Sequence, residues 1–184
     1  MAFTYPFLLS HPVEDKSWMR DCALVLGASI VIGLFAHVSI PLPFTPVPLA
    51  TQPQVILFLS ALLGGKRAVL ATLLFLFEGA MGFPVFAGGA AGLARFAGPT
   101  GGYLLGYLLS AYITGTLFEQ MKERTSVKAF LAMALGNIVI FACGVTWLSQ
   151  LIGWKSALVL GFLPFIIGDI LKLCVAVKAL KTVR

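Results

Sequence analysis

Four prolines occur within the nine residues 40–48, and apolar runs lie on both sides of this segment. Proline has no backbone N–H and a fixed φ, so the segment cannot belong to an ordinary membrane-spanning helix. Repeated prolines favour a stiff, extended backbone instead. We therefore expect a rigid loop between two hydrophobic helices, forming a structured cap over a cavity.

The composition of the chain is typical of a membrane protein. Of its 184 residues, 59% are hydrophobic and 11% are charged, whereas soluble domains carry about 25% charged residues. We predict an all-α membrane protein in which residues 21–184 form a single transmembrane helix bundle. Residues 1–20 are expected to form a cytoplasmic or interfacial N-terminal segment, because they lack the pattern of a cleavable signal.

Apolar runs separated by helix breakers predict six transmembrane spans, none of them with a strong internal stop. A full crossing needs about 20 residues, so the second, third and fourth spans are short. Either their flanks extend them or a cavity enters the bundle from one face. The predicted spans are residues 22–38, 53–63, 68–82, 102–118, 129–148 and 157–180.

The basic residues predict the orientation of this bundle. Ten of the 13 lysines and arginines fall on one side of the predicted spans, and by the positive-inside rule that side is cytoplasmic. Both termini are then cytoplasmic, which agrees with an even number of spans. The net charge of +6 is explained by topology and does not indicate nucleic-acid binding. The ten residues are Lys16, Arg20, Lys66, Arg67, Lys122, Arg124, Lys128, Lys178, Lys181 and Arg184.

A second unusual loop, residues 82–102, is rich in glycine and lies on the predicted outer side with the proline segment. Glycines allow close backbone approach, and Phe83, Phe86 and Phe96 supply apolar anchors. A long loop with its own packing residues is often functional. The alternative is a re-entrant segment that only packs between helices.

At these loops the sequence resembles a known family. The motifs are Pro-Leu-Pro-Phe-Thr-Pro-Val-Pro at 41–48, Gly-Phe-Pro-Val-Phe-Ala-Gly-Gly at 82–89, Gly-Pro-Thr-Gly-Gly-Tyr-Leu-Leu-Gly-Tyr at 98–107 and Gly-Asp-Ile-Leu-Lys at 168–172. In this order and spacing they resemble the BioY family, the biotin-specific substrate-binding components of energy-coupling factor transporters. The resemblance covers residues 36–172. The sequence departs from the family pattern around Gln52 and at Glu78.

The resemblance implies a multi-pass protein of the bacterial plasma membrane that captures biotin from outside. It also implies a membrane coupling subunit with two ATP-binding subunits as partners. The chain has no phosphate-binding loop of its own, so uphill transport would need such partners. Small residues four apart on the first span, Ala23, Gly27, Ser29 and Gly33, suit close helix approach and are candidates for partner docking. Packing within the chain is the alternative.

Ionisable residues inside predicted spans are costly in a bilayer and are candidates for function. They are Glu78, Asp169 and Lys172. Asp169 and Lys172 are three residues apart and therefore share one helix face. We interpret this pair as part of a ligand site, with a mutually neutralising structural pair as the alternative. Glu78 is expected near the outer interface, where its carboxylate stays hydrated.

The chemistry of biotin gives these side chains roles. Its ureido ring has two N–H donors and one carbonyl acceptor, and its tail ends in a carboxylate. Asp169 only accepts hydrogen bonds and suits the ureido N–H groups. Arg95 can form a bidentate pair with the tail carboxylate, and Lys172 supports the site.

Further candidates for the substrate site are polar or aromatic residues near these groups. Asn137 offers a donor and an acceptor, although an interhelical hydrogen bond explains it equally well. Tyr103 and Phe86 could pack on the bicyclic ring, and ordinary core packing is the alternative. Gln52 and Thr51 lie where the proline segment meets the second span and are expected to reach the pocket.

Two other functions remain open at this point. One is a stand-alone biotin facilitator or secondary transporter that works without ATPase partners. The other is an intramembrane enzyme, which would need a nucleophile–base pair or a metal cluster. The sequence offers no convincing arrangement of either kind, and Cys22, Cys143 and Cys174 lack the spacing of a metal site. We therefore expect neither an enzyme nor a bound metal or cofactor.

Overall fold

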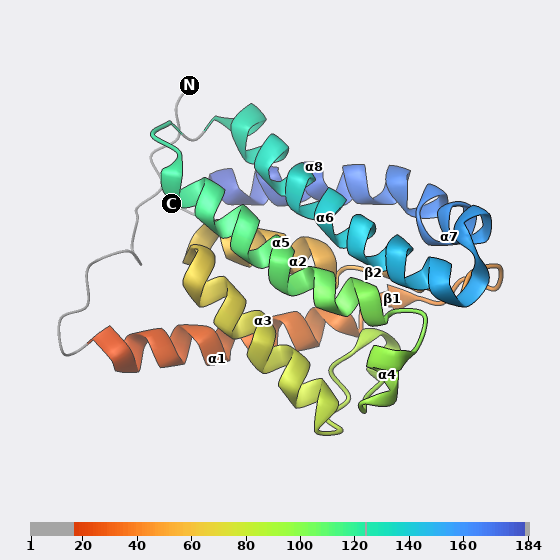
Figure 1. The fold of residues 1–184 in the computed structure, drawn as a ribbon. Helices are drawn as coiled ribbons and strands as arrows, with labels where there is room; N and C mark the ends of the chain where they lie inside the picture. The colour runs from red at the N-terminus through yellow and green to blue at the C-terminus, as the bar shows by residue number, and fades with distance from the viewer. Residues whose placement is uncertain (1–16, 124, 183–184) are drawn as a thin grey trace.

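The computed structural model describes residues 17–123 and 125–182. Most of the predicted N-terminal segment lies outside these residues, as do Lys16, Arg124 and Arg184 of the charge pattern. The described chain is a bundle of helices with short irregular segments gathered at one end (Figure 1). Its long helices are α1 (Ser17–Ala36), α2 (Gln52–Leu63), α3 (Gly65–Ala80), α5 (Gly101–Gln120), α6 (Ser126–Ile152) and α8 (Ile166–Thr182).

The irregular end contains the remaining elements. The proline segment runs between two short strands, β1 (Ser39–Ile40) and β2 (Leu49–Ala50), which pair antiparallel with Ser39 opposite Ala50. The glycine-rich segment contains a 3₁₀ turn, η1 (Ala87–Gly89), and a short helix, α4 (Ala94–Ala97). The helix α7 (Trp154–Gly161) and the 3₁₀ turn η2 (Leu163–Phe165) lead into α8.

The first five predicted spans each coincide with one long helix, whereas the sixth consists of two helices and contains an internal break that the sequence analysis did not expect. Residues 157–180 do not form one uninterrupted helix, because η2 separates α7 from α8. Pro164 lies inside η2, and its missing N–H removes a helical hydrogen bond. The break between α7 and α8 therefore follows from Pro164, which is visible in the sequence.

Three helical stretches of the described chain are long and apolar enough to cross a membrane. They run from Trp18 to Ala36, from Ser126 to Ile152 and, counting α7 and α8 together, from Trp154 to Thr182. On α1, Ile32 and Ala36 are buried while Leu26, Ile30 and Leu34 are about half exposed or more. A helix that is apolar on its exposed face as well as its buried face suits a lipid environment.

The centre of the bundle is the pair α5 and α6, which pack along much of their lengths, with α3 and α2 also against α5. Gly106 of α5 lets the helices approach closely, since a Cβ there would lie 3.1 Å from the Ile140 Cα. Helix α1 packs on α3 and α2, and α8 packs on α6 and α2. Figure 1 shows α1 and α8 on opposite sides of this centre.

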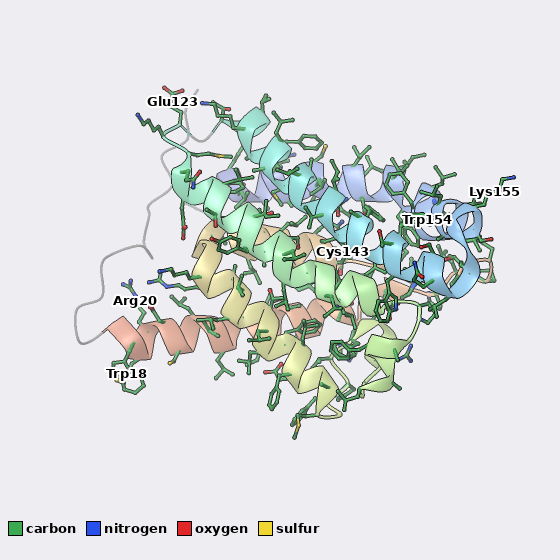
Figure 2. The ribbon with its side chains drawn as sticks, viewed as in Figure 1. Trp18, Arg20, Glu123, Cys143, Trp154 and Lys155 are labelled. Atoms are coloured by element: carbon green, nitrogen blue, oxygen red, sulfur yellow. The ribbon has the colours of Figure 1, made fainter. Side chains whose placement is uncertain are left out.

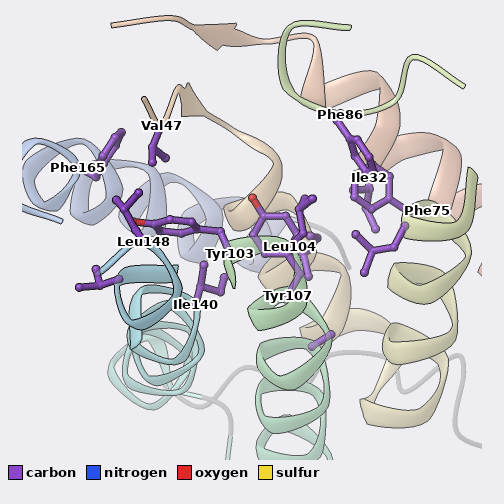
Figure 3. Packing of buried hydrophobic residues seen from close by; sticks show 14 of the residues in the cluster. Ile32, Val47, Phe75, Phe86, Tyr103, Leu104, Tyr107, Ile140, Leu148 and Phe165 are labelled. Atoms are coloured by element: carbon purple, nitrogen blue, oxygen red, sulfur yellow. The ribbon is translucent and has the colours of Figure 1, made fainter. Parts of the chain in front are cut away.

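The two ends of the bundle differ in character. Figure 2 shows Arg20 and Glu123 at one end, here called the inner end, and Trp154 and Lys155 at the other, here called the outer end. A cluster around Leu57, Met133 and Leu180 fills the inner half. A second cluster, with Phe75, Phe86, Tyr103 and Phe165 among its members, lies below the irregular segments (Figure 3).

Polar side chains join α1 to α3. Arg67 Nη2 lies 2.9 Å from Asp21 Oδ1. Ser29 Oγ donates to Glu78 Oε2 at 2.7 Å. Glu78 is half-buried, so the expectation of a merely hydrated carboxylate is incomplete. This residue links two helices within the bundle.

Candidate functional site

A cavity opens at the outer end, between the end of the proline segment, the glycine-rich segment and the helices α2, α5, α6 and α8. Its volume of about 80 Å³ is several times the roughly 10–15 Å³ that one water molecule needs. Its walls are mostly apolar, with a few polar side chains between them, which is the usual make-up of a small-molecule site. The cavity is lined by residues 47–50, Gln52, Pro53, Phe86, Ala87, Ala90, Arg95, Thr100, Tyr103, Leu104, Tyr107, Asn137, Ile140, Phe141, Phe165, Asp169 and Lys172.

The polar wall of the cavity is centred on Asp169, in the first turn of α8. Its side chain is buried, and Lys172 Nζ lies 2.7 Å from its Oδ1. Asn137 Nδ2 of α6 donates to Oδ2 at 3.3 Å, and Gln54 Nε2 lies 3.5 Å from the Asn137 Oδ1. Each carboxylate oxygen thus has one partner and keeps a lone pair for another donor.

Lys172 connects this wall to the proline segment. Besides the ion pair, its Nζ donates to the Ala50 carbonyl at 2.9 Å. The predicted pair on one face of the last span is therefore present, and both members line the cavity. The pair neutralises its own charge, as the structural alternative requires, and it also faces space that a ligand can occupy.

Gln52 is a polar residue of the cavity wall whose hydrogen-bonding groups are not all used. Its side chain is 1% exposed and lines the cavity, yet its Nε2 has no hydrogen-bond partner among the described residues. A buried donor without a partner costs about 1–3 kcal/mol. A ligand acceptor in the cavity would remove that cost.

Arg95 brings a positive charge to the cavity from a different element. It lies in α4, is exposed, and lines the cavity from the side of the glycine-rich segment. Within residues 17–123 and 125–182, no carboxylate is within ion-pair distance of its guanidinium. The arginine is therefore available to an anionic group that enters the cavity.

Two aromatic rings are held against the cavity by glycines. A Cβ on Gly79 would lie 2.1 Å from the Phe86 ring, and one on Gly144 would lie 2.2 Å from the Tyr103 ring. Phe86 also packs edge-to-face on Phe75 at 5.6 Å. The Tyr103 hydroxyl donates to the Gly161 carbonyl at 2.7 Å. Tyr103 therefore offers a ligand its ring, while its hydroxyl is already bonded.

Sequence reasoning missed three aromatic members of the wall, Tyr107, Phe141 and Phe165. Tyr107 lies one helical turn after Tyr103, and Phe141 one turn after Asn137. Residues four apart share a helix face, so this spacing was a usable signal for both. Phe165 had no such signal, because only the break at η2 brings it to the cavity.

Thr51, unlike the other predicted substrate-site residues, does not line the cavity. Its hydroxyl donates to the Phe35 carbonyl at 2.7 Å and lies 3.2 Å from the Val38 carbonyl. Thr51 thus fastens the start of α2 to the end of α1. The neighbouring Gln52 points the other way, into the cavity.

The four small residues of α1 do not form one surface. Ala23 and Gly27 are exposed, whereas Ser29 and Gly33 are buried inside the chain. A Cβ on Gly33 would lie 3.2 Å from Val85 of the glycine-rich segment. The alternative of internal packing therefore applies to Ser29 and Gly33, and only Ala23 and Gly27 remain accessible to a partner.

In the part of the chain that the structure describes, no three His, Cys, Asp or Glu side chains come together as metal ligands would. The cavity instead combines a carboxylate, an ammonium, two amides and a guanidinium with aromatic walls. Such a set is suited to holding a small polar molecule through hydrogen bonds and ring packing.

Comparison with known proteins gives a consistent result. The model of the BioY family matches residues 9–184. The biotin transporter BioY of Rhizobium etli is 38% identical over 167 residues, which cover 85% of this chain and 89% of that protein. The biotin transporter BioY of Thermotoga maritima is also 38% identical, over 83% of this chain and 87% of the relative.

A solved structure has the same fold. It is the crystal structure of the S-component for biotin from an ECF-type ABC transporter, which is 27% identical to this chain. The TM-score is 0.82, and the match covers 94% of this chain and 95% of the other.

Proposed function

The chain belongs to the BioY family, and from this we propose that it is the biotin-binding membrane component of an energy-coupling factor importer. Its relatives are named as transporters, so the chain is a transporter component and not an enzyme. The observation that carries the proposal is one cavity that combines Asp169, Lys172 and Asn137 with the unpartnered amide of Gln52.

In this proposal the polar wall binds the ureido end of biotin. Asp169 accepts hydrogen bonds from the ureido N–H groups, and Gln52 Nε2 donates to the ureido carbonyl. The rings of Tyr103 and Phe86 pack on the bicyclic system. Arg95 pairs with the tail carboxylate at the mouth of the cavity. Lys172 forms an ion pair with Asp169 and holds the proline segment through Ala50.

We place the protein in the bacterial plasma membrane with six crossings and both termini in the cytoplasm. In support, α7 and α8 together are long enough for one crossing, and the inner end holds Arg20, Lys66, Arg67, Lys122 and Lys128. Residues 21–184 then form one substrate-binding domain, preceded by a short cytoplasmic or interfacial segment. The short helix α2 fits a bundle that has a cavity at its outer end.

Uphill import requires energy that this chain does not supply. We propose a membrane coupling subunit with two ATP-binding subunits as partners, docking where Ala23 and Gly27 are exposed on α1. Capture from outside would be followed by closure of the two outer segments and reorientation. Uptake of biotin into liposomes by this chain alone, without ATPases, would instead support the stand-alone facilitator.

Equilibrium binding of biotin to the purified protein in detergent tests the proposed site. Asp169→Asn removes the charge but keeps the shape, and we expect affinity to fall by about 100-fold or more, since it disrupts a buried ion pair. Glu78→Gln is the matched control, because Glu78 bonds to Ser29 and does not line the cavity. Absence of binding by well-folded wild-type protein would refute biotin as the ligand.

A further inference from the structure

The break between α7 and α8 leaves two backbone carbonyls without their helical donors. In an α-helix the Leu160 carbonyl would accept from the N–H of residue 164, which is a proline. The Gly161 carbonyl would accept from Phe165 N–H, but that group donates to the Phe162 carbonyl at 3.0 Å. Buried carbonyls of this kind need other partners.

Two side chains from distant parts of the chain supply them. Thr45 Oγ1, in the proline segment, donates to the Leu160 carbonyl at 2.7 Å. The Tyr103 hydroxyl, on α5, donates to the Gly161 carbonyl at the same distance. The proline in the last span therefore creates an attachment point for the proline segment, 115 residues away along the sequence.

The Thr45 hydroxyl makes a second bond that shapes the segment. It accepts from Val47 N–H at 3.2 Å. The intervening Pro46 has no N–H, so Val47 is the first residue after Thr45 that can donate in this way. The hydroxyl thus acts as donor to α7 and as acceptor from the segment, which uses both of its hydrogen-bonding functions.

The two hydrogen bonds of the Thr45 hydroxyl help to position residues 47–50, which form one wall of the cavity. Residues 47–50 line the cavity, whereas Thr45 does not. Val47 is 7% exposed and belongs to the same apolar cluster as Phe165. Figure 3 shows both on the same side of the Tyr103 ring. At the other end of this wall, Lys172 holds the Ala50 carbonyl. Two attachments of the wall are therefore to the broken last span, in addition to the pairing of β2 with β1.

We propose that Thr45 is a positioning residue that keeps the wall formed by residues 47–50 closed over the bound ligand. It acts through the Leu160 carbonyl, which is free to accept its hydrogen bond because Pro164 has no N–H to donate. The inference rests on the proposed function for the identity of the ligand. Since Thr45 does not line the cavity, its loss should accelerate ligand release by loosening residues 47–50, while the helix side chains that line the cavity remain in place.

The test is the dissociation rate of biotin from the purified protein. Thr45→Val keeps the shape but removes the hydroxyl, and we expect dissociation to accelerate by roughly 5- to 10-fold, as for a lost hydrogen bond. Thr45→Ser retains the hydroxyl and should stay within about twofold of wild type. Wild-type dissociation from the valine variant, or equal acceleration in the serine variant, would overturn the proposal.

Hydrogen exchange in the ligand-free protein provides an independent readout. We expect the amides of Phe44, Thr45, Val47, Leu49 and Ala50 to exchange faster in Thr45→Val than in wild type, and Thr45→Ser to restore protection. This experiment needs no biotin. If wild type failed to bind biotin, the proposed function would be lost, while the exchange data would still decide whether Thr45 holds the segment.

The variant Pro164→Ala tests whether the missing N–H of Pro164 is what leaves the Leu160 carbonyl available to Thr45. The new N–H can compete with Thr45 for the Leu160 carbonyl, so this variant should also release biotin faster. Combined with Thr45→Val it should add little, because both changes break the same contact. Full additivity of the two effects on dissociation would contradict the shared contact.

Discussion

Both ends of this bundle contain polar side chains, but these side chains have different partners at the inner end and at the outer end. At the inner end, polar groups join helices: Arg67 pairs with Asp21, and Glu119 Oε1 accepts from Gly65 N–H at 3.1 Å at the start of α3. At the outer end, backbone groups freed by proline are bonded by side chains such as Thr45 and Tyr103. There, cavity-lining polar groups also remain available to a ligand.

The comparison shows how an apolar bundle can hold an irregular cavity. Irregular backbone at membrane depth is tolerated only where it is buried in protein or lines a cavity. In this chain, Thr45 and Tyr103 meet that requirement for the two carbonyls freed by the break at Pro164. The inner end has continuous helices and an apolar cluster, so substitutions there should affect stability more than binding.

The largest difference between the ends should come from their ion pairs. Asp169→Leu leaves the Lys172 ammonium unpaired beside the cavity, and we expect unfolding free energy to fall by about 3–5 kcal/mol, with loss of biotin binding. The double variant Asp169→Leu, Lys172→Leu should recover most of that stability without recovering binding. Thermal unfolding and equilibrium binding measure the two effects.

The inner-end control is Asp21→Asn, which removes one partner of the Arg67 pair. Asp21 is 29% exposed, so the loss of stability should be only about 0–1 kcal/mol. Biotin affinity should be unchanged. Equal destabilisation by Asp169→Leu and Asp21→Asn would break the distinction between the two ends.

Replacing glycine by alanine should give the next largest difference between the two ends. Gly144→Ala would push a Cβ into the Tyr103 ring, and we expect biotin affinity to fall by about 10- to 30-fold because overpacking moves the cavity wall. Gly136→Ala creates a similar clash with Thr114, 2.2 Å from the new Cβ. Its cost should appear in the melting temperature alone. A loss of affinity in Gly136→Ala that matched Gly144→Ala would count against a localised site.

Gln52→Met should separate binding from stability. It removes the unpartnered donor, so affinity should fall by about tenfold if Nε2 bonds to the ligand. The ligand-free protein should be as stable as wild type or slightly more stable, since a buried unsatisfied group is gone. A variant that loses stability but keeps its affinity would show that Gln52 is structural. Melting curves with and without biotin distinguish these results.

Among the cavity-lining residues, the smallest loss of affinity is expected at Arg95, which is exposed to solvent and screened by salt. Arg95→Ala should weaken biotin binding by about fivefold and leave the affinity for a biotin ester unchanged. Competition binding with both ligands at low and high salt measures this difference. Equal losses of affinity for biotin and its ester would show that Arg95 does not pair with the tail carboxylate.

Much of the architecture was predictable from local patterns. The resemblance to the BioY family is confirmed, and five of the predicted spans coincide with helices because apolar runs and breakers mark helices directly. Of the eight predicted substrate-site residues, all except Thr51 line the cavity. Their roles toward biotin, and the six crossings with cytoplasmic termini, stay predictions.

Side chains that could face either of two neighbouring elements were the ones that the sequence did not place. Thr51 and Gln52 are adjacent at the start of α2, yet one bonds to α1 and the other faces the cavity. Ser29 and Gly27 lie on opposite faces of α1, and only the packing of α3 decided which face was internal. Neither choice is visible in spacing along one helix, because each depends on a neighbouring element.

By itself, the sequence determined which segments are helical, where proline interrupts them and that Asp169 and Lys172 share a face. These properties depend on bonds within a few residues. Only the tertiary structure decided that the Leu160 carbonyl meets Thr45, that Tyr103 uses its hydroxyl internally and that Gln52 Nε2 is left without a partner. The physical reason is that a hydrogen bond requires its two atoms within about 3 Å, and residues far apart in sequence meet that condition only through packing.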